Sequence, residues 1–476
     1  MFGELKGDGL FPIRFLGFGL FWAWLFLTTL SPSPLFGLAT CAGGVPFEMF
    51  ELGVRTLLLV AVVALSRRCA TTRGCLGLLG ASLVAGVAAV PVGLLAAAWA
   101  PTAAACLEAV ADVGMFLLWL SFFGYMRLGD TLALLVLSYA AGSLLFLGIL
   151  PLGRTAAVGA GMLLPALSCA AFVLSRRLQE TRTGVPLFES QATRETPSAL
   201  DKPRLRMTCA LGFYSFAFAL CSALAVRGGG DAWRGYLVEP VAILVLAGIY
   251  LVYIVRFRKT DGPYLLYRAV PVLVGAGLAL LALGVPALFA CGCVTFGYVM
   301  FEMLALNDYC NIVHTENASL LRAMAVARLA ISAGMALGWT ASYGAALWPT
   351  KATGVPALVV SVLFLVVPVA TLLFDGRDVA LMNTLADDRA DAEAGTAGPS
   401  KEELLAGFAQ AYGLSKRETD VLAYLVEGRT TTYTAEKLVV AESTVRAHVH
   451  GIYRKTQVSS RMELLDAFEA YSGQQG

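Results

Sequence analysis

Charged residues are scarce in this sequence: Asp, Glu, Lys and Arg make up 14% of its 476 residues, while 58% are hydrophobic. A soluble domain carries about 25% charged residues, so the chain as a whole is not expected to be water-soluble. Histidine is scarcer still, with only His314, His448 and His450. They form no spacing typical of a nucleophile–base pair or a metal site. We therefore expect no enzyme activity, no metal and no cofactor.

The ten cysteines include no CxxC pair, and the two closest, Cys291 and Cys293, fall inside a hydrophobic run. Such cysteines are typical of small core residues in a reduced or lipid-facing setting, rather than of a metal or disulfide site. A cleavable signal peptide is not expected either. The first apolar run is too long and aromatic, and residues 31–34 form a proline-containing loop rather than a small-residue cleavage site.

Long hydrophobic runs fill the first 374 residues of the chain. A membrane-spanning helix needs about 20 mostly apolar residues. Twelve stretches qualify, at residues 12–30, 48–66, 75–97, 103–125, 131–151, 155–175, 207–226, 236–255, 264–283, 286–306, 323–345 and 354–374. The sequence therefore predicts an all-α protein in which residues 1–374 form a transmembrane bundle of twelve helices.

A polar linker, residues 176–206, divides these spans into two groups of six. This layout resembles the major facilitator superfamily, whose two halves are related by an axis along the membrane normal. The loop at residues 66–74 keeps the basic charges of that family's Gly-x-x-x-Asp-Arg/Lys-x-Gly-Arg-Arg motif. It lacks the acidic residue and the leading glycine. This departure puts transport in doubt, whereas sensing needs only ligand binding and a shifted equilibrium.

Basic residues concentrate on alternate loops between the predicted spans. The even-numbered loops hold Arg67, Arg68, Arg73, Arg127, Arg176, Arg177, Arg182, Arg194, Lys202, Arg204, Arg206, Arg256, Arg258 and Lys259. The odd-numbered loops hold only Arg154, Arg227, Arg234 and Lys351. The positive-inside rule places the even loops, and hence both termini, in the cytoplasm. We expect a multi-pass protein surrounded by lipid in the bacterial inner (plasma) membrane.

Several ionisable residues interrupt the apolar spans, where hydrocarbon tolerates charge only at a cost. Glu51 and Arg55 share one helix face at i, i+4, as an ion pair would, whereas Glu108 and Asp112 repeat this spacing with like charge. At least one of the latter two needs a cation, a proton or a partner arginine, and Arg328 is a further charge inside a span. One interpretation is that these side chains reach the membrane interface or pair within the bundle. The other is that a set of them lines a ligand cavity: Glu108, Asp112, Glu239, Arg268 and Glu302.

The chain changes character after the last apolar run. Residues 375–407 form an acidic linker that we expect to be cytoplasmic, and residues 408–476 a compact soluble module. Two capping boxes, one at Ser400 and one pairing Ser415 with Glu418, predict helix starts. A third helix begins near residue 431, and residues 442–455 form a fourth whose Val445, Val449 and Ile452 follow a helical period. Two helices joined by a tight turn, the second with a polar outward face, indicate a helix-turn-helix.

The residues of this module resemble the LuxR/NarL-type DNA-binding domain. Its pattern is matched at Leu414, Ser415, Arg417, Glu418, Val421, Leu422, Gly428, Arg429, Ala435, Leu438, Thr444, Val445, His448, Ile452, Lys455, Val458, Arg461, Glu463 and Leu464. The resemblance implies that Arg446, Ala447 and His450 contact DNA bases from the recognition helix. Ser443, Thr444, Arg454, Lys455 and Arg461 complete the predicted double-stranded DNA contacts, the last three being placed for phosphates. The final helix is the dimerisation element that the family implies.

Two departures from the pattern bear on DNA affinity. Ala441 stands where the family has a serine that caps the recognition helix. The module also carries as many acidic as basic residues between Phe408 and Tyr471. Phosphate neutralisation supplies most non-specific affinity, so we expect that affinity to be weak and binding to require a homodimer.

Three hypotheses follow from a DNA-binding tail on a membrane body. The first is a membrane-bound one-component transcription regulator whose transmembrane domain senses an unidentified small molecule. The second is a facilitator-type transporter with an appended regulatory tail, which solute uptake by vesicles would distinguish. The third is an inert membrane anchor whose tail is controlled by a separate partner.

Overall fold

The protein is described from a computed structural model covering the whole chain. The residues whose structure is described are 11–30, 35–36, 39–124, 128–183, 202–227, 232–257, 264–316, 320–346, 359, 362, 401–426, 434, 442–458, 463–464, 467–468 and 471. The chain separates into two compact units, Met1–Asn383 and Thr384–Gly476. Each unit is described by itself.

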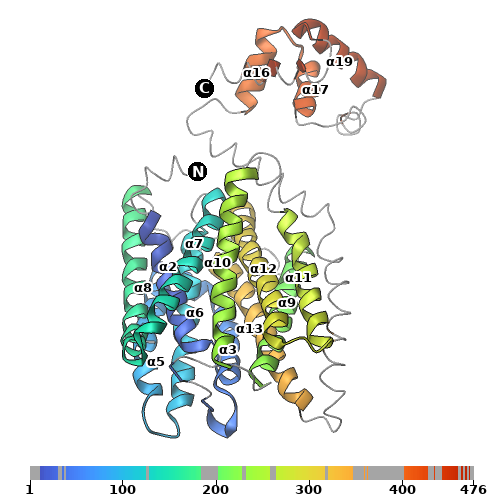
Figure 1. The fold of residues 1–476 in the computed structure, drawn as a ribbon. Coiled ribbons are helices and arrows are strands. Elements are labelled where there is room, and N and C mark those ends of the chain that lie inside the picture. Colours follow the sequence, from blue (N-terminus) through green and yellow to red (C-terminus); the bar gives the residue numbers. More distant parts are fainter. Residues whose placement is uncertain are drawn as a thin grey trace. The chain divides into compact units, whose positions relative to one another are not determined.

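The first unit is a bundle of long helices (Figure 1). Its main helices are α2 (Phe11–Thr29), α3 (Phe47–Ala64), α5 (Thr72–Gly93), α6 (Ala100–Phe123), α7 (Leu128–Ile149), α8 (Arg154–Thr183), α9 (Lys202–Arg227), α10 (Ala232–Phe257), α11 (Tyr264–Ala282), α12 (Ala287–Glu316) and α13 (Leu320–Ala346). Each coincides with a predicted span. The twelfth predicted span, residues 354–374, lies outside the described residues except for positions 359 and 362. The described part of the chain contains no named strand, which confirms the all-α class.

Seven of the described helices are long and apolar enough to cross a membrane: α5, α6, α7, α8, α9, α12 and α13. The apolar parts of α2, α10 and α11 are shorter, at Leu16–Thr29, Leu237–Val252 and Leu266–Ala282. Long apolar helices in this number are characteristic of a multi-pass membrane protein.

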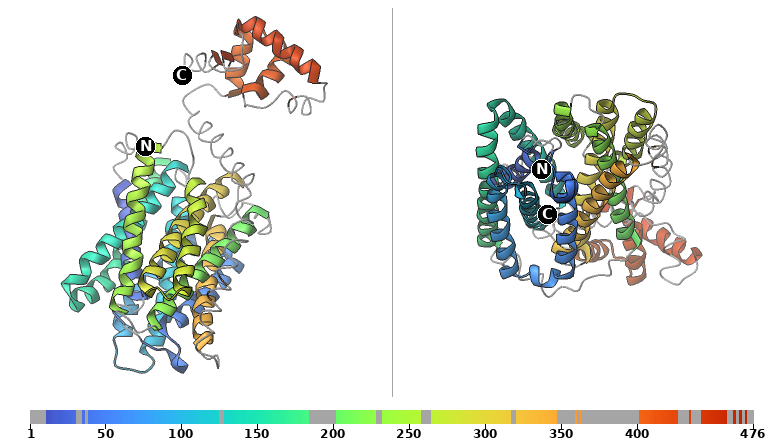
Figure 2. Two further views of the ribbon diagram at one scale, coloured as in Figure 1. Left: turned by 45° about the vertical axis from the view of Figure 1, so that its right-hand side comes forward. Right: turned by 90° about the horizontal axis from the view of Figure 1, so that it is seen from below.

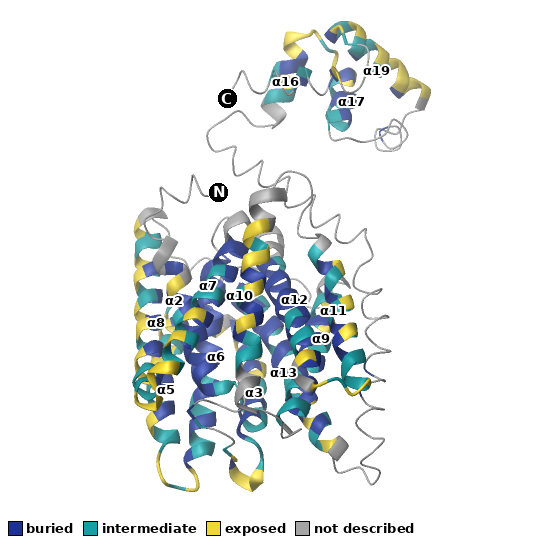
Figure 3. Cartoon of the chain, viewed as in Figure 1, coloured by how far each residue is buried: buried dark blue, intermediate teal, exposed yellow. Residues whose placement is uncertain are grey.

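The helices fall into two groups that lie side by side when the bundle is seen along its axis (Figure 2). One group comprises α2 to α8 and the other α9 to α13. The seam between them is formed by contacts of α13 with α3 and α6, and of α7 with α10 and α12. Burial is greatest on α6 and α12, whereas α5 exposes much of its length (Figure 3). Side chains on α6 and α12 therefore lie at the centre of the bundle.

Small residues allow helices to approach closely within each group. A side chain at Gly142 of α7 would collide with Trp22 and the Gly19 carbonyl of α2, and one at Gly334 of α13 with the Gly212 backbone of α9. Such glycines are typical of membrane bundles, where association rests on van der Waals packing rather than on a hydrophobic driving force. Close backbone approach thus replaces large interlocking side chains at these crossings.

The second unit contains α16 (Lys401–Ala411), α17 (Lys416–Val426) and α19 (Glu442–Thr456). Its core consists of Phe408, Val421, Leu422, Leu425, Val445, Ile452, Leu464 and Phe468. The Ser415 hydroxyl accepts from the Glu418 amide at 3.3 Å, and a Glu418 carboxylate oxygen accepts from the Ser415 amide at 2.7 Å. This is the predicted capping box, and it starts α17 where the sequence indicated. The helix expected near residue 431 lies outside the described residues, apart from a buried Thr434.

We predict that residues 400–476 fold without the membrane body. Phe408 of α16 is fully buried and packs against Phe468 and Tyr471, so Phe408→Ala should cost about 3–5 kcal/mol of unfolding free energy. Gln410→Ala, on the exposed face of the same helix, should be nearly neutral. Urea unfolding followed by circular dichroism measures both. An isolated fragment without helical signal would contradict the prediction.

Candidate functional site: a buried charge cluster and a DNA-binding helix

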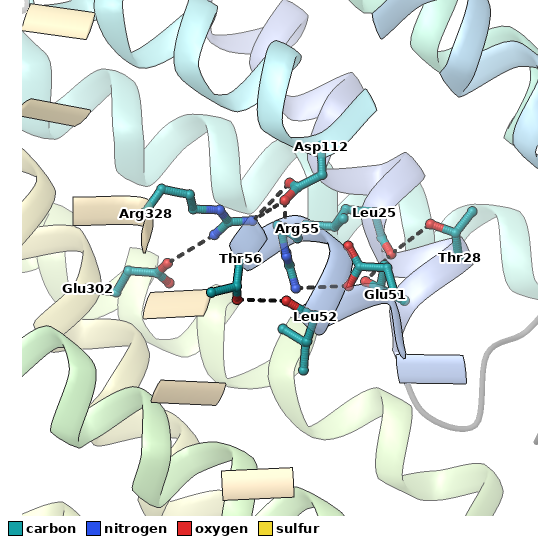
Figure 4. Close-up of polar contacts among 10 residues, drawn as sticks. Leu25, Thr28, Glu51, Leu52, Arg55, Thr56, Asp112, Glu302 and Arg328 are labelled. Atoms are coloured by element: carbon teal, nitrogen blue, oxygen red, sulfur yellow. Dashed lines mark hydrogen bonds and ion pairs between the residues drawn. The ribbon is translucent and has the colours of Figure 1, made fainter. Parts of the chain in front are cut away.

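Asp112 of α6 is held by two arginines that come from opposite groups of helices (Figure 4). One carboxylate oxygen accepts from the Arg55 Nη1 atom of α3 at 2.8 Å. The Arg328 Nη2 atom of α13 donates to both carboxylate oxygens, at 2.8 and 3.0 Å. All three side chains are buried. The carboxylate therefore joins α3, α6 and α13 at the seam.

The cluster continues outward from the two arginines. Arg55 also pairs with Glu51 one turn earlier on α3, at 3.0 Å. Arg328 approaches Glu302 of α12 at 3.8 Å, and its guanidinium lies 4.0 Å from the centre of the Phe116 ring. The pairing of Glu51 with Arg55 matches the interpretation made from their spacing. Three carboxylates thus share two guanidinium groups in the interior.

Glu108 lies one turn before Asp112 on α6 but has a different environment. It is fully buried, and neither carboxylate oxygen has a hydrogen-bond partner among the described residues. The Thr28 hydroxyl of α2 faces it but donates to the carbonyls of Trp24 and Leu25, at 3.2 and 3.4 Å. The like charges at i, i+4 are accommodated unequally, because Asp112 obtains both arginines and Glu108 none.

Two other residues of the predicted cavity are placed differently. Glu239 of α10 is half-buried and interacts electrostatically with Glu302 and Arg328. Arg268 lies in the second turn of α11 and is exposed, so the structure does not bring it into the cluster. A long cationic side chain near a helix end is typical of one that extends to the membrane interface. We therefore remove Arg268 from the candidate site.

Two buried tyrosines at the seam were not predicted as site residues. Tyr139 of α7 and Tyr298 of α12 are within electrostatic reach of Glu302 and Arg328. The Tyr298 hydroxyl lies close to Glu302 and Ser215, whereas the Tyr139 hydroxyl has no hydrogen-bond partner among the described residues. Buried hydroxyls normally find a partner, so that of Tyr139 is available to a polar ligand. A signal was present in the sequence, because Tyr298 and Glu302 share one helix face at i, i+4.

In the second unit, α19 separates a buried face from an exposed face. Val445, Ile452 and Thr456 are buried, as the helical period indicated for the first two. The exposed side carries Ser443, Thr444, Arg446, Ala447, His450 and Arg454. Six predicted DNA-contacting residues thus lie on the surface of one helix. Arg461, the last predicted phosphate contact, lies outside the described residues.

Lys455 is the exception on α19, because its ammonium group bonds within the domain. The Nζ atom lies 2.6 Å from a Glu418 carboxylate oxygen and donates to the Gly413 carbonyl at 3.0 Å. These contacts join the end of α19 to the start of α17. Lys455 therefore has a structural role, and its contact with a DNA phosphate stays a prediction.

Glu418 has an altered pKa because of the same contacts. Burial alone would raise the pKa of this carboxyl, but the hydrogen bond from Lys455 and those from Ser415 outweigh it and lower the pKa from 4.5 to about 2. A carboxylate with a lowered pKa stabilises the folded state above its unfolded value. That contribution is lost as the pH falls from 4.5 toward 2.

The pH dependence of the tail tests this ion pair. As the pH falls from 4.5 to about 2, the range between the two pKa values, the free energy of unfolding of wild-type residues 400–476 should decrease relative to that of a Glu418→Gln variant. Above pH 4.5 the variant should be the less stable protein, because Lys455 has lost its anionic partner. Urea unfolding across the pH range measures the difference. A constant gap between the two proteins would show that Glu418 is not the titrating group.

The charge cluster predicts a graded loss of stability in the membrane body. Asp112→Asn leaves two buried arginines without their shared anion and should cost about 3–5 kcal/mol. Glu302→Gln should cost less, because its ion pair with Arg328 is longer, at 3.8 Å. Glu180→Gln is the control, since Glu180 pairs with Arg176 near the surface of α8 at 3.6 Å. Each full-length variant is purified in detergent and heated, and the protein that survives is recovered by size exclusion, which gives the order of stability. Equal losses in all three variants would contradict the prediction.

The second unit matches a known family of DNA-binding domains. Residues 413–468 match the model described as "Bacterial regulatory proteins, luxR family". The chain is 41% identical over 58 residues to the Fimbriae Z protein of Escherichia coli K12, covering 12% of this chain and 28% of that protein. It is 38% identical over 71 residues to the response regulator protein TmoT of Ectopseudomonas mendocina, covering 15% and 31%. The chain thus spans under a third of the length of these curated relatives.

The first unit resembles a transporter in fold alone. The crystal structure of the human organic anion transporter MFSD10 (TETRAN) superposes with a TM-score of 0.56 at 14% sequence identity, covering 76% of this chain and 98% of that one. The likeness confirms the predicted transporter-like fold of the helical body. Taken together, the chain joins a helical body similar in fold to a solved transporter to a C-terminal region, residues 413–468, that matches the model of the luxR family.

Proposed function

We propose that the protein is a membrane-bound, one-component transcription regulator. The observation that carries this proposal is the exposed face of α19, which belongs to a luxR-family domain and is continuous in one chain with an apolar body. Even-numbered loops rich in Lys and Arg support a body with both termini in the cytoplasm of a bacterium. DNA lies on that side of the inner membrane, which the tail must reach.

The α19 face supports a division of labour between bases and phosphates. Arg446, Ala447 and His450 lie near the middle of the helix, where a recognition helix in the major groove meets base edges. An arginine there suits a bidentate contact to guanine. Ser443 and Thr444 at the helix start and Arg454 near its end are placed for the sugar–phosphate backbone. With one such helix per domain, two copies of the chain would recognise a pair of half-sites.

The charge cluster at the seam supports a sensing role for the body. Asp112, Glu302 and Arg328 join elements of both helix groups, while Glu108 and Glu239 lie beside them. A ligand can shift an equilibrium only by its differential affinity for two states. A small molecule bound among these groups would favour one arrangement of the seam, and the acidic linker would pass that change to the tail.

A transporter with a regulatory tail is the second candidate, favoured by the likeness of the body to a solved transporter. Uptake of labelled solutes by vesicles containing the full-length protein separates the two. Transcriptional responses without solute accumulation support the regulator. Accumulation that depends on the body and continues after deletion of residues 400–476 supports the transporter.

The DNA-binding roles predict different effects for two arginines. Sites occupied by the full-length protein are first located by chromatin immunoprecipitation, and the affinity of the tail is then measured on those sites and on random DNA. Arg446→Ala should lose about 1–3 kcal/mol on the specific sites only. Arg454→Ala should weaken binding to both DNAs alike. It should also reduce the slope of the logarithm of affinity against the logarithm of salt concentration by about one.

Arg417→Ala is the matched control for loss of a positive charge. Arg417 is exposed on α17, where it pairs with Asp420 at 3.6 Å. The Arg417→Ala variant should bind the specific sites as tightly as the wild-type tail does. If Arg446→Ala and Arg417→Ala behave alike on specific sites, α19 is not the recognition helix.

A further inference from the structure

Negative charge exceeds positive charge inside the membrane body. Around the seam, Glu51, Asp112 and Glu302 share the two guanidinium groups of Arg55 and Arg328. Glu108 adds a fourth buried carboxyl with no hydrogen-bond partner among the described residues. An isolated ionised carboxylate is very costly to bury. The site therefore has an unmet requirement for positive charge, in the form of a proton or a bound cation.

The carboxyls that need positive charge belong to α3 and α6. Both oxygens of Glu108 and the Oε1 atom of Glu51 lack partners in the described residues, and Glu51 is within electrostatic reach of Glu108. The other groups near Glu108 are Glu48 and Arg55 of α3 and Thr28 of α2, together with Cys41. Two buried carboxyls with three unpartnered oxygens thus lie within electrostatic reach of one another.

The surroundings suit an organic cation better than a metal ion. No group of three or more His, Cys, Asp or Glu side chains suited to a metal occurs among the described residues. One turn before Glu108, Ala104 and Ala105 pack against Phe47, whose ring centre lies 5.2 Å from that of Phe36. Apolar and aromatic side chains do not replace the water shell of a metal ion, but they do cover the hydrocarbon part of an ammonium or phosphonium compound.

We propose that Glu108 and Glu51 bind the positive group of an organic cation, and that this cation is the ligand class sensed by the membrane body. The inference rests on the proposed function for its sensing role, while the binding site stands on the geometry alone. Glu51 connects the site to the seam, because the Arg55 that it contacts also holds Asp112. A cation that draws Glu51 toward Glu108 weakens the hold on Arg55. Occupancy is thereby transmitted to the contact between the two groups of helices.

The test uses the purified full-length protein in detergent and two probes of the same shape and opposite charge, tetraphenylphosphonium and tetraphenylborate. Binding is measured by equilibrium dialysis, and protection of Glu108 from dicyclohexylcarbodiimide is read by peptide mass spectrometry. The phosphonium should bind and protect Glu108, and the borate should do neither. Glu108→Gln should weaken phosphonium binding by about tenfold to a hundredfold, the range expected for one lost charged contact.

Glu180→Gln, on the outer helix α8, is the control and should bind the phosphonium as wild type does. Equal protection by both probes, or unchanged binding in Glu108→Gln, would overturn the site. If the variant does not fold, protection in the wild-type protein decides the matter. Reporter expression distinguishes the two proposals: a protected Glu108 with no transcriptional response to the phosphonium leaves the site standing and removes its sensing role.

Discussion

The membrane body depends on one buried carboxylate. Asp112 accepts hydrogen bonds from Arg55 and Arg328, and these arginines come from different groups of helices. Removing one member of such a buried set leaves charge uncompensated, at about 3–5 kcal/mol. The positions of α3, α6 and α13 are therefore coupled electrostatically at the seam. The proposed sensing role would require this contact to have at least two arrangements, which a ligand binds with different affinity.

Sequence periodicity located the helices but not their neighbours. Eleven of the predicted spans coincide with described helices, because hydrophobic length is a local property of the chain. The partners of buried charges are long-range: Glu108 and Asp112 are one turn apart on α6, yet only Asp112 meets the arginines of α3 and α13. The exposure of Arg268 likewise depends on which helices surround α11. The position of Tyr139 near Glu302 and Arg328 likewise depends on how the two groups of helices pack.

The tail shows the same division between local and distant signals. The Ser415–Glu418 capping box and the buried Val445 and Ile452 follow from spacings of three to seven residues, and each was predictable. The contact of Lys455 with Glu418 was not predicted, because the two residues lie 37 positions apart in the chain. A lysine matching a family pattern at a helix end suggests a phosphate contact, and nothing nearby in the sequence indicates otherwise. The capping carboxylate instead serves both α17 and α19.

The engagement of Lys455 has a consequence for control of the tail. The tail is balanced in charge, and this ion pair leaves Arg446 and Arg454 as the exposed basic residues of the described α19. A single domain with few phosphate contacts binds DNA weakly, because counterion release scales with the number of those contacts. In the proposed homodimer, affinity would depend on holding two domains together, because the second would bind at an effective concentration set by the linker. A membrane body that changes the pairing of its tails could therefore control transcription without altering the DNA-binding surface.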